Sequence, residues 1–544
     1  MVDTVKWGNI SILKKNWAII LISLILLFAF FLRVYHIDYP VVGYHNWKET
    51  HYLTESRNFA EDGFFKYGFF IPTADFMFAE GNYTNINGIH TDTFPTTSII
   101  GGVLFMIFGE SLTIARLSSI FLMLGAVFFM YLFIDKLFKR KDLALLSALI
   151  MAINPLFIFF GRQFQLINPA LFFMMGSLYF YTYWREKPSM KYFILFAMFA
   201  SLSIITKYSF ALFGLPIIFT FPYRRLKNKK GWKQILMGSL FLLPIIFWWV
   251  YTNIKAPIYN SLPADIHVNL STVFTSNFWD IMKSYAADNY TFIGLLFALI
   301  GLIFMIYFRK NNFGNKFIIS WFIGSIIWFF VMSFKLSGHN YHQYPIAPMV
   351  IIFIAYFFVV FASNINMILK NKYIGVIIAI LLFWFLFSSS MDSSHRMFDT
   401  QFVGLDIAGE YINQHSEPYE RLIYPSHQSH GVIWHADRKG FSKQDGINSI
   451  KLAEEKNSTW IFVYQWGFDI MDKPEWEYIT QSYSLKQAAF IRSGNGQFSP
   501  LYILLNKGGS FSMEELNILS DNYELQTKDY EFYNGIQKVY YFNL

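Results

Sequence analysis

Long apolar runs separated by short polar segments fill the first 390 residues of the chain. A helix needs about 20 mostly apolar residues to cross a hydrocarbon core of roughly 30 Å, and runs of this kind recur throughout this region. They cover residues 17–34, 112–135, 143–161, 164–184, 191–206, 208–222, 235–252, 291–308, 317–334, 345–363 and 373–390. The pattern predicts a polytopic α-helical membrane protein with about eleven transmembrane helices.

Two places in this pattern need a separate interpretation. The shorter runs 191–206 and 208–222 meet at Thr206-Lys207, which predicts a helical hairpin whose tip lies at one membrane face. The segment 95–109 begins at Pro95 and contains three glycines, so we expect an interfacial helix that does not cross.

The distribution of basic residues tests that choice, because Lys and Arg accumulate in short cytoplasmic loops. If 95–109 does not span, the basic clusters near residues 14, 139, 187, 229, 309 and 371 all fall on one side. The N-terminus is then cytoplasmic, and the loop 35–111 and the C-terminus are extracytoplasmic. The first apolar segment lacks a small-residue cleavage site and is expected to be an uncleaved signal anchor. The net charge of +8 therefore reflects membrane topology and not nucleic-acid binding.

The pattern changes after residue 390. Short apolar runs at 421–424, 459–464 and 501–505 alternate with polar segments of helical periodicity. This alternation predicts an extracytoplasmic α/β domain over 391–544, following a transmembrane domain over 1–390. Its residues His427, His430, His435 and Asp437 match no standard metal-ligand spacing, and we interpret them as surface and turn residues.

Composition supports the membrane class. The chain is 54% hydrophobic and only 15% charged, with a mean hydropathy of +0.34, which excludes an ordinary soluble globular protein. It has no cysteine, and this excludes thiolate nucleophiles and Cys-based zinc sites.

Ionisable residues concentrate in the first external loop, 35–111. This loop carries His45-Asn46-Trp47-Lys48-Glu49, then Arg57-Asn58-Phe59, and then Asp92-Thr93-Phe94-Pro95. Further polar motifs follow at the expected outer ends of later spans: Gly161-Arg162-Gln163, Thr206-Lys207 and the stretch His339–Pro345. Since all of them are expected on one face, the sequence predicts a reactive site at the outer surface of the membrane.

The order of these motifs, with Gly109–Leu117 after the first loop, resembles the GT-C superfamily of polyprenyl-phosphate-sugar-dependent glycosyltransferases. The resemblance covers roughly residues 15–390 and is to the branch of protein mannosyltransferase-like and aminoarabinose-transferase-like enzymes. His45-x-Trp47-Lys48-Glu49 is similar to the His-x-Trp-Arg-Gln motif of one subgroup. The chain departs from better-known relatives in two ways: Lys48 precedes Glu49 where they have an Asp-Glu pair, and the segment at Asp92 lacks the lysine of their Glu-Lys-Pro motif.

The resemblance implies transfer of a sugar, with inversion, from a polyprenyl-phosphate donor to a lipid, glycan or protein acceptor at the outer face of the cell membrane. It implies Glu49 and Asp92 as catalytic carboxylates, one of them the general base. Ligands for the donor phosphate would be Lys48, Arg57, Arg162 and Lys207, and residues in contact with substrate would be His45, Trp47, His339 and His342. No metal or other cofactor is required, and a divalent cation is compatible but not implied.

Two other functions remain open at this point. A polysaccharide polymerase or ligase would place its chemistry in loops between later spans, and loop 253–290 carries Asp265, His267, Asp280, Lys283 and Asp288. A lipid-linked sugar transporter or flippase should show internal repeats and charged residues at mid-membrane, and the spans are nearly free of charge.

Overall fold

The computed structural model describes residues 8–544 except 75, 78, 81–82, 85–87, 259–268, 308–311, 372, 426, 444–445, 466–472, 493–495, 513, 515 and 517–523. The chain divides into two compact units. Unit 1 comprises residues 1–37, 116–250 and 265–394, and unit 2 comprises residues 38–115, 251–264 and 395–544. Each unit is described by itself.

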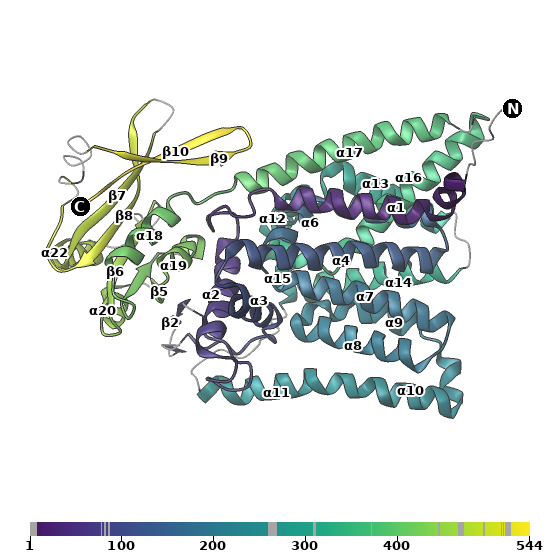
Figure 1. Ribbon diagram of the computed structural model, residues 1–544, viewed down its shortest axis with the longest axis horizontal. Coiled ribbons are helices and arrows are strands. Elements are labelled where there is room, and N and C mark those ends of the chain that lie inside the picture. Colours follow the sequence, from purple (N-terminus) through teal and green to yellow (C-terminus); the bar gives the residue numbers. More distant parts are fainter. Residues whose placement is uncertain are drawn as a thin grey trace. The chain divides into compact units, whose positions relative to one another are not determined.

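Unit 1 is a bundle of helices, most of which run side by side in Figure 1. The helices that form it are α1 (Gly8–Val34), α4 (Leu112–Phe138), α5 (Lys141–Ile153), α6 (Pro155–Arg162), α7 (Ile167–Glu186), α8 (Met190–Thr206), α9 (Gly214–Thr220), α10 (Lys229–Ser239), α11 (Leu243–Ile258), α12 (Ser276–Tyr290), α13 (Phe292–Tyr307), α14 (Phe313–Val331), α15 (Ser333–Gly338), α16 (Ala347–Ile368) and α17 (Ile374–Asp399). Each of the eleven apolar runs expected from the sequence therefore lies on helix.

Not every run is long enough to cross a membrane as one straight helix. Among the described residues, six helices have the length and hydropathy of a span, or up to eight if two bent pairs each count as one. The pair α5 and α6 bends by 60° where Pro155 begins a new helix. The pair α12 and α13 bends by 89° at Thr291. The expected hairpin break is present, since α8 ends at Thr206.

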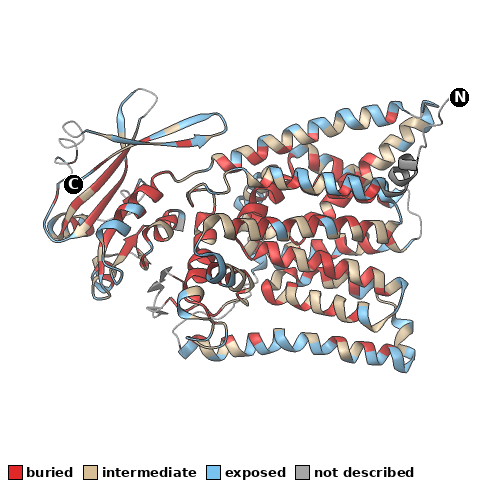
Figure 2. Cartoon of the chain, in the orientation of Figure 1, coloured by how far each residue is buried: buried red, intermediate tan, exposed pale blue. Residues whose placement is uncertain are grey.

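The surface and the interior of the bundle differ as a lipid environment requires. Only 17% of the apolar window of α17 and 11% of that of the continuous segment α10–α11 is buried, and Figure 2 shows long exposed stripes on both. Where α13 meets α16, the backbones come very close: a Cβ at Gly301 would collide with the carbonyl oxygen of Phe353. Small residues at such contacts are typical of membrane helix packing.

Unit 2 contains an eight-stranded sheet in the order β1-β5-β4-β6-β8-β7-β10-β9. The strands are β1 (Phe76–Met77), β4 (Arg421–Tyr424), β5 (Gly440–Ser442), β6 (Ser458–Tyr464), β7 (Tyr483–Arg492), β8 (Phe498–Lys507), β9 (Gln526–Phe532) and β10 (Gly535–Asn543). The neighbours β1, β5, β4 and β6 pair in parallel. From β6 onward, through β8, β7, β10 and β9, each strand is antiparallel to the one before it in the sheet.

Helices pack on both faces of this sheet. Residues of α18 (Leu405–His415) and α19 (Gly431–Ala436) form one buried core with the sheet, and residues of α20 (Ile447–Glu454) and α22 (Lys473–Ser482) form the other. The α/β domain expected after residue 390 is therefore present.

Residues 38–111 of the first loop belong to the same unit as this domain. Its strand β1 pairs with β5, the amide of Phe402 donates to the carbonyl of Val42 over 2.7 Å, and Val42 and Ala74 are part of the core. A division at 390 separates the loop from the residues with which it packs, because the sequence pattern carries no signal for pairing across more than 300 residues.

The loop also contains the hairpin β2 (Ala79–Glu80) and β3 (Tyr83–Thr84) and two helices, α2 (Asn46–Asp62) and α3 (Thr96–Phe108). With 13 residues, α3 spans only about 20 Å at 1.5 Å per residue, too short for a membrane. One face packs on α2, with Gly102 against Phe59, while Met106 and Phe108 are exposed. These features suit the interfacial position expected for residues 95–109.

Candidate functional site

Helix α2 is polar in sequence and buried in the structure. Of its 17 residues, twelve are buried, and most of these are polar or charged: Asn46, Glu49, Thr50, His51, Thr54, Glu55, Ser56, Arg57 and Asn58. Burying such groups is costly unless each is paired. A helix that is buried for reasons other than apolar packing is a strong indicator of a functional site.

The most tightly grouped side chains are His51, Glu55 and His90. The Oε1 atom of Glu55 lies 3.0 Å from Nε2 of His51 and 2.9 Å from Nδ1 of His90. The second carboxylate oxygen of Glu55 accepts a hydrogen bond from the Ser98 hydroxyl on α3. The donor atoms of His51, Glu55 and His90 all lie within 4.8 Å of one another, and among the described residues this is the one group of three with a geometry that suits a metal ion.

The electrostatics of the cluster favour an ionised carboxylate. Burial by itself would raise the pKa of Glu55, but the two histidines lower that pKa well below its usual value. Burial lowers the pKa of His51 to about 4 despite the attraction of Glu55. Burial also opposes the charge on His90, yet its hydrogen bond to Glu55 and the charges of Glu55 and Asp92 raise its pKa.

The candidates predicted at the start of the first loop lie on α2 or at its N-cap, in unit 2. Glu49 is buried on the first turn of α2, and His45 is buried at its N-cap. The Lys48 ammonium lies 4.1 Å from the centre of the Trp47 ring. Its charge acts on both His51 and His90, and the partly exposed Asp92 acts on His90, so the structure brings Lys48 and Asp92 to the same cluster.

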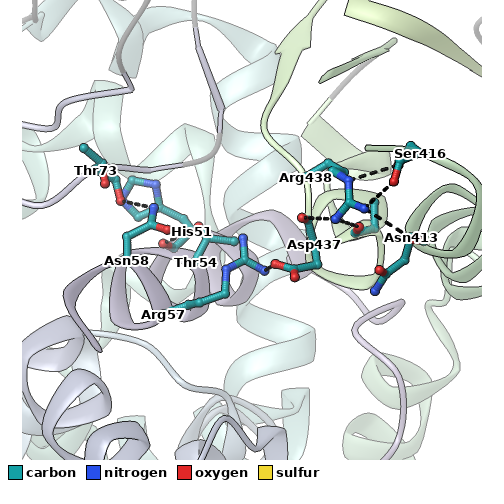
Figure 3. A network of polar contacts seen from close by, with 10 residues as sticks. His51, Thr54, Arg57, Asn58, Thr73, Asn413, Ser416, Asp437 and Arg438 are labelled. Carbon is teal, nitrogen blue, oxygen red and sulfur yellow. Dashed lines mark hydrogen bonds and ion pairs between the residues drawn. The ribbon is translucent and has the colours of Figure 1, made fainter. Parts of the chain in front are cut away.

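Arg57 has a different neighbour. Its Nη1 atom forms an ion pair of 2.6 Å with Asp437 in the turn after α19, as Figure 3 shows. That turn is held by Arg438, whose guanidinium donates to the carbonyls of Asn413, Ser416 and Asp437. The Asp437 carboxylate is half exposed, whereas Arg57 is buried. This contact joins α2 to the C-terminal sheet domain.

A second group of candidates lies in unit 1. The Lys207 ammonium is 5.2 Å from the centre of the Tyr341 ring, which stacks on His339 at 5.2 Å and lies 4.7 Å from His342. The neighbouring Asn289 side chain donates to the carbonyl of Asn340 and to Oε1 of Gln343. The structure thus brings together three residues that the sequence analysis selected from two distant motifs.

Arg162 lies elsewhere in unit 1. It is buried in the last turn of α6 and donates to the carbonyls of Tyr35 and His36 over 2.8 and 2.6 Å. Tyr35 and His36 follow the end of α1, so these bonds satisfy carbonyls just beyond the C-terminus of a helix.

The remaining residues that the sequence analysis names belong to neither group. Asp265 and His267 and the side chain of His427 lie outside the described residues. His435 accepts a hydrogen bond from the Val41 amide over 3.1 Å, and Asp437 pairs with Arg57. The expectation that His430 is a surface residue is wrong, because its side chain is buried with the ring 5.2 Å from that of Tyr424.

Sequence reasoning did not select His51, Glu55 or His90. The signal for two of them was present, because residues four apart on a helix share one face. The prediction of a loop over residues 35–111 hides this signal, because the periodicity has meaning only in a helix. Nothing in the sequence pattern predicts the approach of His90.

Comparisons with known proteins agree with the architecture. The family model described as dolichyl-phosphate-mannose-protein mannosyltransferase matches residues 92–251, under a third of the chain. No curated protein matches the sequence.

Several solved structures share the fold over most of the chain. ArnT from Cupriavidus metallidurans bound to undecaprenyl phosphate has a TM-score of 0.57 and 12% identity, over 97% of this chain and 98% of that one. The oligosaccharyltransferase AglB from Archaeoglobus fulgidus, in complex with an inhibitory peptide and a dolichol-phosphate, has a TM-score of 0.59 and 14% identity over 90% and 74%. It was also solved with Zn and sulfate. The arabinofuranosyltransferase AftD from Mycobacteria has a TM-score of 0.50 and 10% identity over 91% and 40%.

These similarities carry information about fold, since all the identities are low. This chain has a bundle of apolar helices and a sheet domain, as expected from its sequence, and its fold matches ArnT over almost the whole length of both proteins. The chain therefore shares the fold of these membrane proteins, and its residues 92–251 match the mannosyltransferase family model.

Proposed function

We propose that this protein is an inverting glycosyltransferase that moves a sugar from a polyprenyl-phosphate donor to an acceptor hydroxyl at the outer face of the cell membrane. The observation that carries the proposal is the buried polar helix α2 of the first loop, set in a chain with the GT-C fold. The acceptor, whether lipid, glycan or protein, and the identity of the sugar are left open.

The reaction needs a base for the acceptor and positive charge for the leaving group. The acceptor oxygen attacks the anomeric carbon, the bond from that carbon to the phosphate oxygen breaks, and a carboxylate takes the acceptor proton. Asp92 is our choice for the base, because it is partly exposed and can be reached by an acceptor. Glu49, which is buried at the start of α2, is the better candidate for orienting neighbouring groups.

The leaving polyprenyl phosphate carries the negative charge, so nearby cations stabilise the transition state. Lys48 and Lys207 are proposed as the principal phosphate ligands. Arg57 and Arg162 were assigned the same role on sequence grounds, and we retain it as a secondary proposal. To bind the phosphate, Arg57 would have to give up its ion pair with Asp437. Arg162 would have to give up its hydrogen bonds to two backbone carbonyls.

Aromatic and imidazole groups are proposed to contact the sugar or the acceptor. In unit 2 these are His45 and Trp47 at the start of α2, and in unit 1 they are His339 and His342 beside Lys207. We also propose a cytoplasmic N-terminus and an extracytoplasmic C-terminus, which the positions of the basic clusters support.

The test is sugar transfer by purified, full-length protein with polyprenyl-phosphate sugars as donors. Loss of a positioned base typically costs about 10²- to 10⁴-fold in rate, and we expect a loss in that range for Asp92→Asn and a smaller one for Glu49→Gln. The matched controls Asp142→Asn and Glu410→Gln make the same chemical changes at exposed positions and should retain activity. Normal activity of both Asp92→Asn and Glu49→Gln would refute the assignment and shift attention to loop 253–290.

A further inference from the structure

The cluster of His51, Glu55 and His90 has the dimensions of a metal site. Its two measured separations, 3.0 and 2.9 Å, both end at Oε1 of Glu55. In a tetrahedral site with bonds of about 2.0–2.1 Å, neighbouring donor atoms are about 3.3 Å apart. The two distances to Glu55 are within a few tenths of an ångström of that value, and all three donor atoms lie within 4.8 Å of one another, so side-chain adjustments would let the cluster hold an ion.

The chain fixes these three donors before any ion arrives. His51 and Glu55 are four residues apart, so they project from the same face of α2. The backbone near His90 is held by bonds from its own amide to Pro72 and from the Ala74 amide to Gly88. Gly88 has a φ of +65°, and a Cβ there would collide with the carbonyl of Ala74, so only glycine allows this close approach.

A hydrogen bond from outside the cluster orients the carboxylate. Ser98, buried near the start of α3, donates to the Glu55 oxygen that faces away from the histidines. Such outer contacts are typical of metal sites, where they fix the orientation of the ligands. The hydrogen bond from Ser98 leaves Oε1 of Glu55 directed at the two imidazoles.

The donor set indicates which ions fit. Two imidazole nitrogens and one carboxylate oxygen suit Zn²⁺ and similar transition metals, whereas Mg²⁺ and Ca²⁺ prefer oxygen alone. Three protein ligands leave a fourth position for water or a substrate oxygen. The His90 side chain is 27% exposed while His51 and Glu55 are almost fully buried, so the accessible side of the cluster is at His90.

We propose that His51, Glu55 and His90 bind one divalent transition-metal ion of the Zn²⁺ type. This inference concerns binding and does not rest on the proposed reaction. The rival explanation is a purely structural cluster, in which both imidazoles donate hydrogen bonds to Glu55 and no ion enters.

The experiment uses full-length protein purified in detergent, treated with a chelator and then freed of it. Titration with Co²⁺ should produce the visible absorption of a four-coordinate site, saturating at one ion per chain. Zn²⁺ should abolish that absorption by displacement, while Mg²⁺ and Ca²⁺ at the same concentrations should not. Absence of Co²⁺ or Zn²⁺ binding to the unsubstituted protein would establish the structural cluster and overturn the proposal.

Variants locate the ion. We expect His90→Gln and His51→Ala to lose saturable binding, and Ser98→Ala to weaken it by about 10- to 100-fold. The control His415→Gln replaces an exposed histidine on α18 of the same unit and should bind as the parent does. Size-exclusion profiles verify folding, and the partly exposed His90 serves as the decisive position if His51→Ala does not fold. Unchanged Co²⁺ binding by folded His90→Gln would place the ion elsewhere and refute the assignment.

Discussion

Asn46→Ala removes the side chain that joins the start of α2 to the start of α19. The Asn46 amide donates to the carbonyl of Gln428 over 2.8 Å, and its oxygen accepts from the amide of Gly431 over 2.9 Å. Helix α19 has no side-chain cap of its own, so Asn46 satisfies one of its unpaired N-terminal amides from a distant part of the chain. A larger residue at position 431 would collide with the carbonyl of Val41.

The expected cost follows from these two bonds. The Gly431 amide is buried, and leaving it unpaired costs about 1 to 3 kcal/mol, while losing the bond to the partly buried Gln428 carbonyl costs about 0.5 to 1.5 kcal/mol. The total is about 1.5 to 4.5 kcal/mol. For a unit of about 240 residues, 1 kcal/mol shifts Tm by about 2 to 4 °C, so we expect the Tm of unit 2 to fall by about 3 to 18 °C.

Thermal unfolding of the full-length protein in detergent measures this shift, with tryptophan fluorescence as the probe. Asn413→Ala is the matched control, because it removes an exposed asparagine side chain from α18 of the same unit. Glu49 lies less than one turn after Asn46, so the variant should also transfer sugar more slowly below its Tm. A Tm equal to that of Asn413→Ala would refute the reasoning, since the two bonds would then contribute nothing.

Two other outcomes are expected. Burial would raise the pKa of Glu454, but hydrogen bonds from Lys507, Tyr483 and Tyr478 lower it overall. The ionised carboxylate therefore stabilises the folded state at pH values above the pKa of the unfolded state. This stabilisation is lost as the pH falls through the lower pKa of the folded state. The Tm difference between the parent and Glu454→Gln should therefore be largest near pH 7 and shrink below about pH 4, and a pH-independent difference would contradict this. A reporter fused after Leu544 should be extracytoplasmic and one inserted near Lys229 cytoplasmic, and finding both on one side would refute the orientation.

The transmembrane part of the fold could be predicted from hydropathy because its cause is local. Each apolar run must be helical in lipid to satisfy its own backbone, whatever its neighbours are. The number of full spans is harder to predict from the sequence. It depends on bends at Pro155 and Thr291, and only the proline has a clear sequence signal.

The site was only partly predictable. Sequence motifs predict Glu49, Lys48 and Asp92 as site residues. In the structure, the charge of Lys48 acts on His51 and His90, and that of Asp92 acts on His90. The members of that cluster were missed, since His90 reaches Glu55 through the fold of the loop and not through any periodic pattern. The ion pair of Arg57 with Asp437 has the same origin, because its partners are separated by most of the chain.

The burial of α2 gives the C-terminal domain a specific role. Nine of the twelve buried residues of α2 are polar or charged, so paired polar contacts contribute much to its position, beside its packing on α3. The sheet domain supplies several of them: Gln428 and Gly431 to Asn46, His435 to the Val41 amide, and Asp437 to Arg57. It also extends its sheet with β1 from the same loop, upstream of His90. The domain after residue 394 therefore acts as the scaffold that fixes the first loop, and the proposed catalytic and metal-binding side chains depend on it for their positions.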